Sequence, residues 1–88
     1  MASDREVVRE SRRTRAADFF AEPDVRSVLD LLEVFDRAWH DYCAESRPPQ
    51  LVVDDLFVLN QGDLSKLIGA TRSALRDWRD TRLAADAI

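Results

Sequence analysis

The chain of 88 residues contains only one cysteine, one histidine, two glycines and three prolines. A single cysteine excludes an internal disulfide, and so few glycines and prolines leave little room for the turns that join strands. No apolar run reaches the length of a signal peptide or a membrane helix, so we expect a cytoplasmic protein that does not enter a membrane. One cysteine and one histidine also fall short of a closed zinc site, and we expect neither metal nor cofactor.

The charge is acidic overall but unevenly distributed. The formal net charge is −4, which argues against generic affinity for nucleic acid, because lysine and arginine supply most nonspecific contacts to phosphate. Residues 1–15 carry a net +2, residues 16–60 carry −7 and residues 61–88 carry +1. This asymmetry is compatible with DNA contacts at both ends of the chain, while the acidic middle faces away or faces a protein.

The remaining composition is that of a small helical protein. Hydrophobic residues make up 45% of the chain and charged residues 34%, as in an ordinary globular domain. We expect an all-α fold with one domain over residues 16–88. Because a chain of this size buries only a modest part of its surface, we also expect a homodimer.

Residues 1–15 contain only Val7 and Val8 as sizeable apolar side chains. Two such residues are too few to anchor a segment, and termini are often disordered. We therefore predict a mobile or frayed basic arm, which is either a solvated and weakly helical tail or an arm that reaches DNA phosphates or a minor groove.

Residues 23–46 carry the strongest helical pattern, which Pro23 and Asp24 open. Apolar side chains recur every three or four residues along it, as in a long amphipathic helix. This stripe is either an interface with a second subunit or partner, or the core on which the C-terminal helices pack. Its members are Val25, Val28, Leu32, Phe35, Trp39 and Tyr42.

Pro48 and Pro49 end that helix, and a linker follows. The next segment, residues 51–59, is ambiguous, because its β-branched residues allow a strand while Asp54 or Asp55 could cap a helix. We favour a helix.

Residues 61–82 contain two short apolar-periodic segments that meet at Gly69. A glycine at this place suits the end of a helix, and Thr71 suits the N-cap of the next one. The spacing predicts two helices that cross steeply through a turn of about three residues, the geometry of a helix-turn-helix.

This stretch resembles the bacterial helix-turn-helix family, Cro-like and Fis-like regulators among them, whose pattern looks like Q-x-x-L-A-x-x-x-G-V-S-x-x-x-L-x-x-W. Serine stands at position 65 where alanine is usual, and alanine at position 70 where a larger aliphatic residue is usual. The matching residues are Gln61, Leu64, Ser65, Ile68, Gly69, Ala70, Thr71, Leu75 and Trp78.

The resemblance implies roles for these residues and their neighbours. Thr71, Arg72, Ser73 and Arg76 would face base edges or phosphates, Gln61 would hold a phosphate, and Arg79 would add a backbone contact. Leu64, Ile68, Leu75 and Trp78 would lie in the core.

Residues that could carry catalysis or bind a metal are sparse. Asp36, His40 and Cys43 follow one another at helical spacing, but a histidine beside an apolar stripe more often bonds a nearby acid. No serine is framed as a nucleophile, and the adjacent Asp54 and Asp55 point to different faces. We do not expect an enzyme.

The leading hypothesis is therefore a homodimeric, sequence-specific protein that binds double-stranded DNA as a transcriptional regulator. A second hypothesis is an acidic protein-interaction module, such as an adaptor, antitoxin-like protein or inhibitor, that docks a protein partner through residues 25–42. A third is an accessory protein of phage DNA packaging or recombination.

Overall fold

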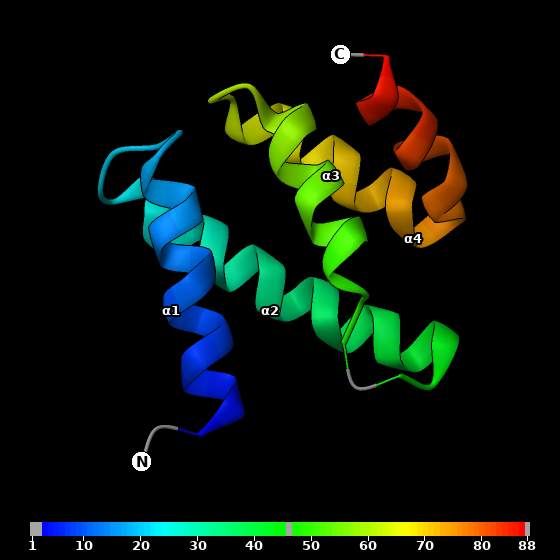
Figure 1. Cartoon of the computed structure of the whole chain (residues 1–88), viewed down its shortest axis with the longest axis horizontal. Coiled ribbons are helices and arrows are strands. Elements are labelled where there is room, and N and C mark those ends of the chain that lie inside the picture. Colours follow the sequence, from blue (N-terminus) through cyan, green and yellow to red (C-terminus); the bar gives the residue numbers. More distant parts are fainter. Residues whose placement is uncertain (1–2, 46, 88) are drawn as a thin grey trace.

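The computed structural model describes residues 3–45 and 47–87, and these residues form four helices and no strand (Figure 1). The predicted all-α fold is confirmed. The molecule is flat, with extents of 36 × 31 × 17 Å. The helices are α1 (Asp4–Ala17), α2 (Asp24–Cys43), α3 (Gln50–Asn60) and α4 (Leu64–Asp86).

The N-terminal residues 4–17 form helix α1, so the structure differs from the mobile arm predicted for residues 1–15. Ser3 caps this helix, because its side-chain oxygen accepts a hydrogen bond from the backbone N–H of Glu6. Residues 1 and 2 of the predicted arm lie outside the described residues. The helix is held against α2 by side chains that are mainly charged rather than apolar.

Helix α2 covers most of the predicted residues 23–46 but ends three residues earlier, at Cys43. Ala44 adopts the left-handed conformation, with φ of 58°, and its N–H bonds to the carbonyl of His40. This hydrogen bond closes the helix before Pro48 and Pro49 are reached.

Helix α3 confirms the helix that we favoured for residues 51–59. It is followed by a tight turn in which Gln61 and Gly62 both have positive φ, 49° and 74°. Asp63 then caps α4, since its carboxylate accepts hydrogen bonds from the N–H groups of Ser65 and Lys66. The helix boundary in this part of the chain is therefore at residues 61–63.

The predicted turn at Gly69 is wrong, because α4 continues in helical geometry through Gly69 and Thr71. The conformation that needs glycine occurs seven residues earlier, at Gly62. The register of the helix changes accordingly: Ile68 and Trp78, expected in the core, are each 42% exposed.

Helix α4 does bend, but at Asp77, whose φ of −157° and ψ of 102° are extended rather than helical. The Asp77 carboxylate accepts a hydrogen bond from the backbone N–H of Arg79, as an N-cap does. Residues 64–76 and 78–86 are thus two straight segments of α4.

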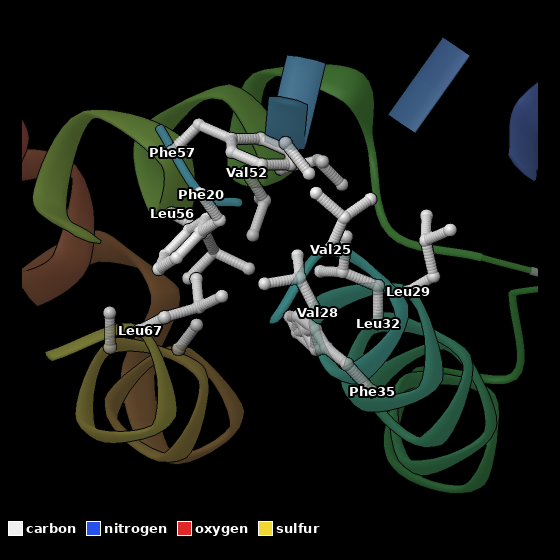
Figure 2. Close-up of a cluster of buried hydrophobic side chains, with 14 of the residues drawn as sticks. Phe20, Val25, Val28, Leu29, Leu32, Phe35, Val52, Leu56, Phe57 and Leu67 are labelled. Atoms are coloured by element: carbon white, nitrogen blue, oxygen red, sulfur yellow. The ribbon is translucent and has the colours of Figure 1, made fainter. Parts of the chain in front are cut away.

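One hydrophobic core joins α2, α3 and the first segment of α4, and Figure 2 shows these side chains facing one another. Leu32 and Phe35 come from α2, Leu56 from α3 and Leu67 from α4, and each is at most 2% exposed. Helix α3 packs most extensively against α4, and α1 packs against α2, with Ala16 near its end in the same core. The core therefore fixes which face of α4 points outward.

Candidate nucleic-acid interface

The first segment of α4 presents a polar outward face. Its inward side is set by Leu67, Ala70 and Ala74, which are at most 9% exposed and lie in the core. At 3.6 residues per turn, the opposite side of the helix carries a single stripe of exposed residues. We call this stripe the α4 outward face; it consists of Ser65, Gly69, Arg72, Ser73 and Arg76.

The α4 outward face is positively charged. Residues 64–76 include Lys66, Arg72 and Arg76 and contain neither aspartate nor glutamate. Lys66 donates a hydrogen bond to the side-chain oxygen of Gln61, 2.9 Å away. Within residues 3–45 and 47–87, no carboxylate forms an ion pair with Arg72 or Arg76. Both guanidinium groups are therefore available to an external anion.

Gly69 lies in the middle of this face, and the fold gives no reason for a glycine there. A Cβ added at this position would meet no atom within 4 Å in the part of the chain that the structure describes. Glycine inside a helix costs about 1 kcal/mol relative to alanine. Its backbone, bare of a side chain, allows another molecule to approach the helix closely.

The structure brings together three of the six predicted DNA-binding residues. Arg72, Ser73 and Arg76 share the α4 outward face, as the sequence predicted. Thr71 does not, because it is 4% exposed and its hydroxyl donates to the carbonyl of Ile68. A base contact from Thr71 is therefore wrong: with the turn placed at residues 61–63, position 71 points into the core.

Gln61 and Arg79 lie at the two ends of this face rather than on it. Gln61 lies in the turn before α4, where its side chain holds Lys66. Arg79 lies beyond the bend, and its Nε is 3.3 Å from the carboxylate of Asp77. That carboxylate is half-exposed and already balances much of the charge of Arg79.

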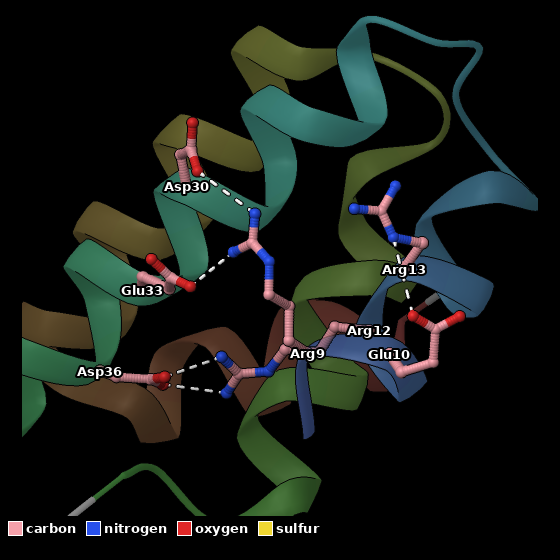
Figure 3. Close-up of polar contacts among 7 residues, drawn as sticks. All are labelled: Arg9, Glu10, Arg12, Arg13, Asp30, Glu33 and Asp36. Atoms are coloured by element: carbon pink, nitrogen blue, oxygen red, sulfur yellow. Dashed lines mark hydrogen bonds and ion pairs between the residues drawn. The ribbon is translucent and has the colours of Figure 1, made fainter. Parts of the chain in front are cut away.

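Arg9 and Arg12 of α1, unlike Arg72 and Arg76 of α4, are paired with carboxylates of the same chain, which the sequence analysis did not predict. Figure 3 shows Arg9 and Arg12 reaching from α1 to the acidic residues of α2. Arg12 is 8% exposed and donates two hydrogen bonds, of 2.8 and 2.9 Å, to the carboxylate of Asp36. Arg9 pairs with Glu33 and lies 3.7 Å from Asp30.

A matching spacing could have indicated these pairs. The acids on α2 recur every three residues, at Asp30, Glu33 and Asp36, and the arginines at 9 and 12 have the same spacing. Helices that pack side by side align such rows. Residues 4–17 therefore form a docked helix rather than a free basic arm, because four of their five arginines form ion pairs within the chain.

The apolar stripe of α2 is largely internal. Five of its six predicted interface residues are at most 4% exposed, packed in the core of a single chain: Val25, Val28, Leu32, Phe35 and Trp39. Only Tyr42 is exposed, to 76%. Docking of a partner on the whole stripe is therefore wrong, because α3 and α4 already cover it.

Asp36, His40 and Cys43, which the sequence places at helical spacing but which we did not expect to bind a metal, have separate surroundings. Asp36 is bound by Arg12, His40 donates from Nδ1 to the carbonyl of Glu45 at 3.0 Å, and Cys43 is exposed. Among the described residues, no group of three or more histidine, cysteine, aspartate or glutamate side chains could hold a metal ion.

Comparisons with known proteins do not place this chain in a family. No protein-family model matches it, and neither the curated proteins nor the solved structures yielded a match. In residues 3–45 and 47–87, none of the helices combines the length and the apolar character that crossing a membrane requires.

Proposed function

We propose that the protein binds double-stranded DNA by laying the first segment of α4 in the major groove, and that it acts there as a regulator. The observation that carries the proposal is the α4 outward face itself. It combines two guanidinium groups that have no ion-pair partner in the described residues with a glycine that the fold does not require.

The chemistry of this face suits a groove in DNA. The major groove is wide enough for an α-helix, and arginine binds guanine edges or phosphates with two parallel hydrogen bonds. Arg72 and Arg76 lie one turn apart on one side of the helix, so both reach the same stretch of duplex. At Gly69 the helix backbone can come close to the groove.

We interpret α3, the turn that follows it and α4 as a helix-turn-helix in a register different from the predicted one. Its turn is at residues 61–63, α3 is its first helix and α4 its second, and the two cross closely (Figure 1). A turn of three residues that contains a glycine is typical of such units.

A net charge of −4 is compatible with this proposal because several of the acids already lie against arginines of the same chain. Three acids of α2, at positions 30, 33 and 36, face arginines of α1 rather than solvent alone. We expect weak nonspecific binding that depends on salt, and tighter binding to a specific site. A regulator of this size commonly binds two half-sites, so we expect two copies on each site.

The test is a fluorescence polarisation titration with labelled duplex DNA, of random sequence and from genomic fragments, at two salt concentrations. Wild type is compared with Arg72→Ala/Arg76→Ala and with Arg13→Ala/Arg26→Ala, a control that removes two arginines outside the α4 outward face. We expect the α4 variant to bind at least about tenfold more weakly, and the control to bind within about twofold of wild type.

Two results contradict the proposal. No binding by wild type at low salt excludes DNA as the partner of this surface. An equal loss in the control variant means that overall charge, rather than the α4 outward face, governs binding.

A protein partner is the second candidate function, and it rests on a different surface. Tyr42 and Trp78 are 76% and 42% exposed, and both line a cavity of about 210 Å³ between the end of α2 and the bend of α4. Exposed aromatic side chains of this kind anchor protein interfaces. Sedimentation of wild type and of Tyr42→Ala/Trp78→Ala tests it: loss of a dimer in the variant supports an interface at this place.

A further inference from the structure

A second feature of the chain is a cavity of about 450 Å³ in the angle between α1 and α2. Its volume lies within the range of small-molecule sites, about 300–1,000 Å³. The wall is dominated by one residue type, and its arginines are Arg5, Arg9, Arg12, Arg37 and Arg47.

The electrostatics of the lining favour an anion. Asp4, Glu33 and Asp36 are the acids of the wall, so five arginines against three carboxylates leave a net charge of +2. Glu33 and Asp36 are already bound by Arg9 and Arg12, and Figure 3 shows these pairs along one side of the angle. The excess of positive charge lies in the other arginines.

Arg5, Arg37 and Arg47 supply that excess. They come from α1, from α2 and from the segment after α2, and all three are exposed. None of them has an ion-pair partner within the described parts of the chain. Three guanidinium groups from three segments that line one cavity can surround an anion from several sides.

Arg9 and Arg12, which are held in place by ion pairs, form a rigid part of the cavity wall. Arg12 is 8% exposed and is held by two hydrogen bonds to Asp36, so its position costs little further ordering when a ligand binds. Guanidinium groups match the geometry of phosphate oxygens and bind them with paired hydrogen bonds. A phosphate group is therefore the anion that this wall fits best.

The same cavity also has apolar surface, which indicates a ligand with an organic part in addition to its phosphate. Val8, which is half-buried, and the aliphatic parts of the arginine side chains supply this surface, and the buried Leu29 lies behind them. An inorganic anion would leave this apolar surface unused. We propose that the cavity between α1 and α2 binds a small organic phosphate of nucleotide size.

This site is independent of the proposed DNA interface. In Figure 1 α1 lies at the left of the molecule and α4 at the right, with α2 between them. None of the lining residues of the cavity belongs to α3 or α4. The two sites can therefore be removed separately.

The experiment is isothermal titration calorimetry of the full chain with three probes: ADP, inorganic pyrophosphate and adenosine. Wild type is compared with Arg37→Ala/Arg47→Ala, which removes two exposed arginines of the cavity, and with Arg72→Ala/Arg76→Ala as the matched control. Far-UV circular dichroism and urea midpoints verify that all three proteins are equally folded.

We expect ADP to bind wild type more tightly than pyrophosphate does, and adenosine not to bind. Arg37→Ala/Arg47→Ala should weaken ADP binding at least about tenfold, while the control stays within about twofold of wild type.

Three outcomes overturn the proposal. Wild type that does not bind ADP at millimolar concentration has no such site. Equal affinity for ADP and pyrophosphate means that the apolar wall contributes nothing and that any polyanion suffices. A loss in the α4 variant as large as in the cavity variant places ADP on the α4 outward face instead.

Discussion

Helices α1 and α4 are both rich in arginine, yet the two helices use it in opposite ways. Arg9 and Arg12 of α1 lie against three carboxylates of α2, and Arg12 is almost fully buried. Arg72 and Arg76 of α4 project from a face that has no acid within residues 64–76. Arg9 and Arg12 hold helices together, whereas Arg72 and Arg76, before the bend of α4, stay free for an external anion. Beyond the bend, Arg82 of α4 also pairs within the chain, with the buried carboxylate of Asp55.

The difference teaches that local charge counts do not reveal function. Residues 1–15 are more basic than residues 61–88, yet four of their five arginines form ion pairs within the chain, whereas Arg72 and Arg76 form none among the described residues. A buried guanidinium has to be paired, because a buried charge without a partner is very costly. An exposed one loses little free energy by remaining unpaired.

The largest expected effect is on stability, in α1. Arg12→Ala should lower the free energy of unfolding by about 3 kcal/mol, because it leaves the carboxylate of Asp36 partly buried without its partner. Urea unfolding followed by circular dichroism measures the change. Arg5→Ala on the same helix, an exposed arginine, should change it by no more than about 0.5 kcal/mol.

A second variant of this pair sharpens the test. Arg12→Met/Asp36→Leu should recover most of the lost stability, since apolar replacements often substitute for a buried ion pair. A loss below about 1 kcal/mol in Arg12→Ala would show that water already screens the pair, and the contrast with α4 would fail.

The next effect is on DNA affinity, in α4. Arg72→Ala should weaken binding by about 1–3 kcal/mol if the side chain reads a base, and Arg76→Ala should lower the salt slope by about 1 if it binds a phosphate. Neither should change the urea midpoint, because both side chains are exposed. Titrations at several salt concentrations measure both quantities.

Arg9→Ala is the matched control from α1. It should lower stability modestly, because the pair with Glu33 is about one-third exposed, and should leave the salt slope unchanged. A reduced salt slope in this variant would mean that α1 also touches DNA, contrary to the comparison.

A smaller effect is expected at the bend that ends the basic segment of α4. Asp77→Ala removes the cap of residues 78–86 and should cost about 1 kcal/mol of stability, measured as a lower melting temperature. The same change removes an acid next to Arg76, so DNA affinity should rise. Asp77→Asn should preserve the cap and still raise the affinity; equal destabilisation by both variants would contradict the capping role.

The smallest effect is expected at Gly69, where one substitution should change stability and DNA affinity in opposite directions. Gly69→Ala should stabilise the protein by about 0.5–1 kcal/mol, because alanine is the better helix former and its Cβ meets no other atom. The same Cβ should weaken DNA binding, since it keeps the helix from close approach. Unchanged affinity in Gly69→Ala, with Ser73→Ala as the control on the same face, would show that DNA does not approach at this position.

Sequence reasoning located the helices well where apolar periodicity was long. The pattern of α2 from Val25 to Trp39 predicted a helix whose apolar face had to be covered, because periodicity records which residues face a core. It left open whether α3 and α4 or a second chain would cover that face, since both bury the same side chains.

Boundaries were predicted less well, because two signals competed. Gly69 and Thr71 have the chemistry of a helix end and a cap, and so do Gly62 and Asp63. Burial decided between them: Ala70 and Ala74 pack in the core only if the helix continues through Gly69. Tertiary packing thus overrode a local preference of about 1 kcal/mol.

In the candidate site, too, some positions could be predicted from the sequence and others depended on tertiary packing. Arg72, Ser73 and Arg76 were predicted together because their spacing puts them on one side of any helix. Thr71 was assigned to the wrong side, because the phase of the helix relative to the core depends on where the turn lies. The ion pairs of α1 could not be assigned, since they depend on which helix packs beside it.

By itself, the sequence determined an all-helical chain, the long α2 with its apolar face, and a basic stretch at residues 64–76 free of acids. These follow from local geometry and composition, which act within a few residues. Only the tertiary structure decided that Arg9 and Arg12 of α1 pair with α2, that α4 continues through Gly69, and that most of the α2 stripe is core. Those outcomes depend on burial and charge pairing between segments distant in sequence, whose free energies exist only once the helices pack together.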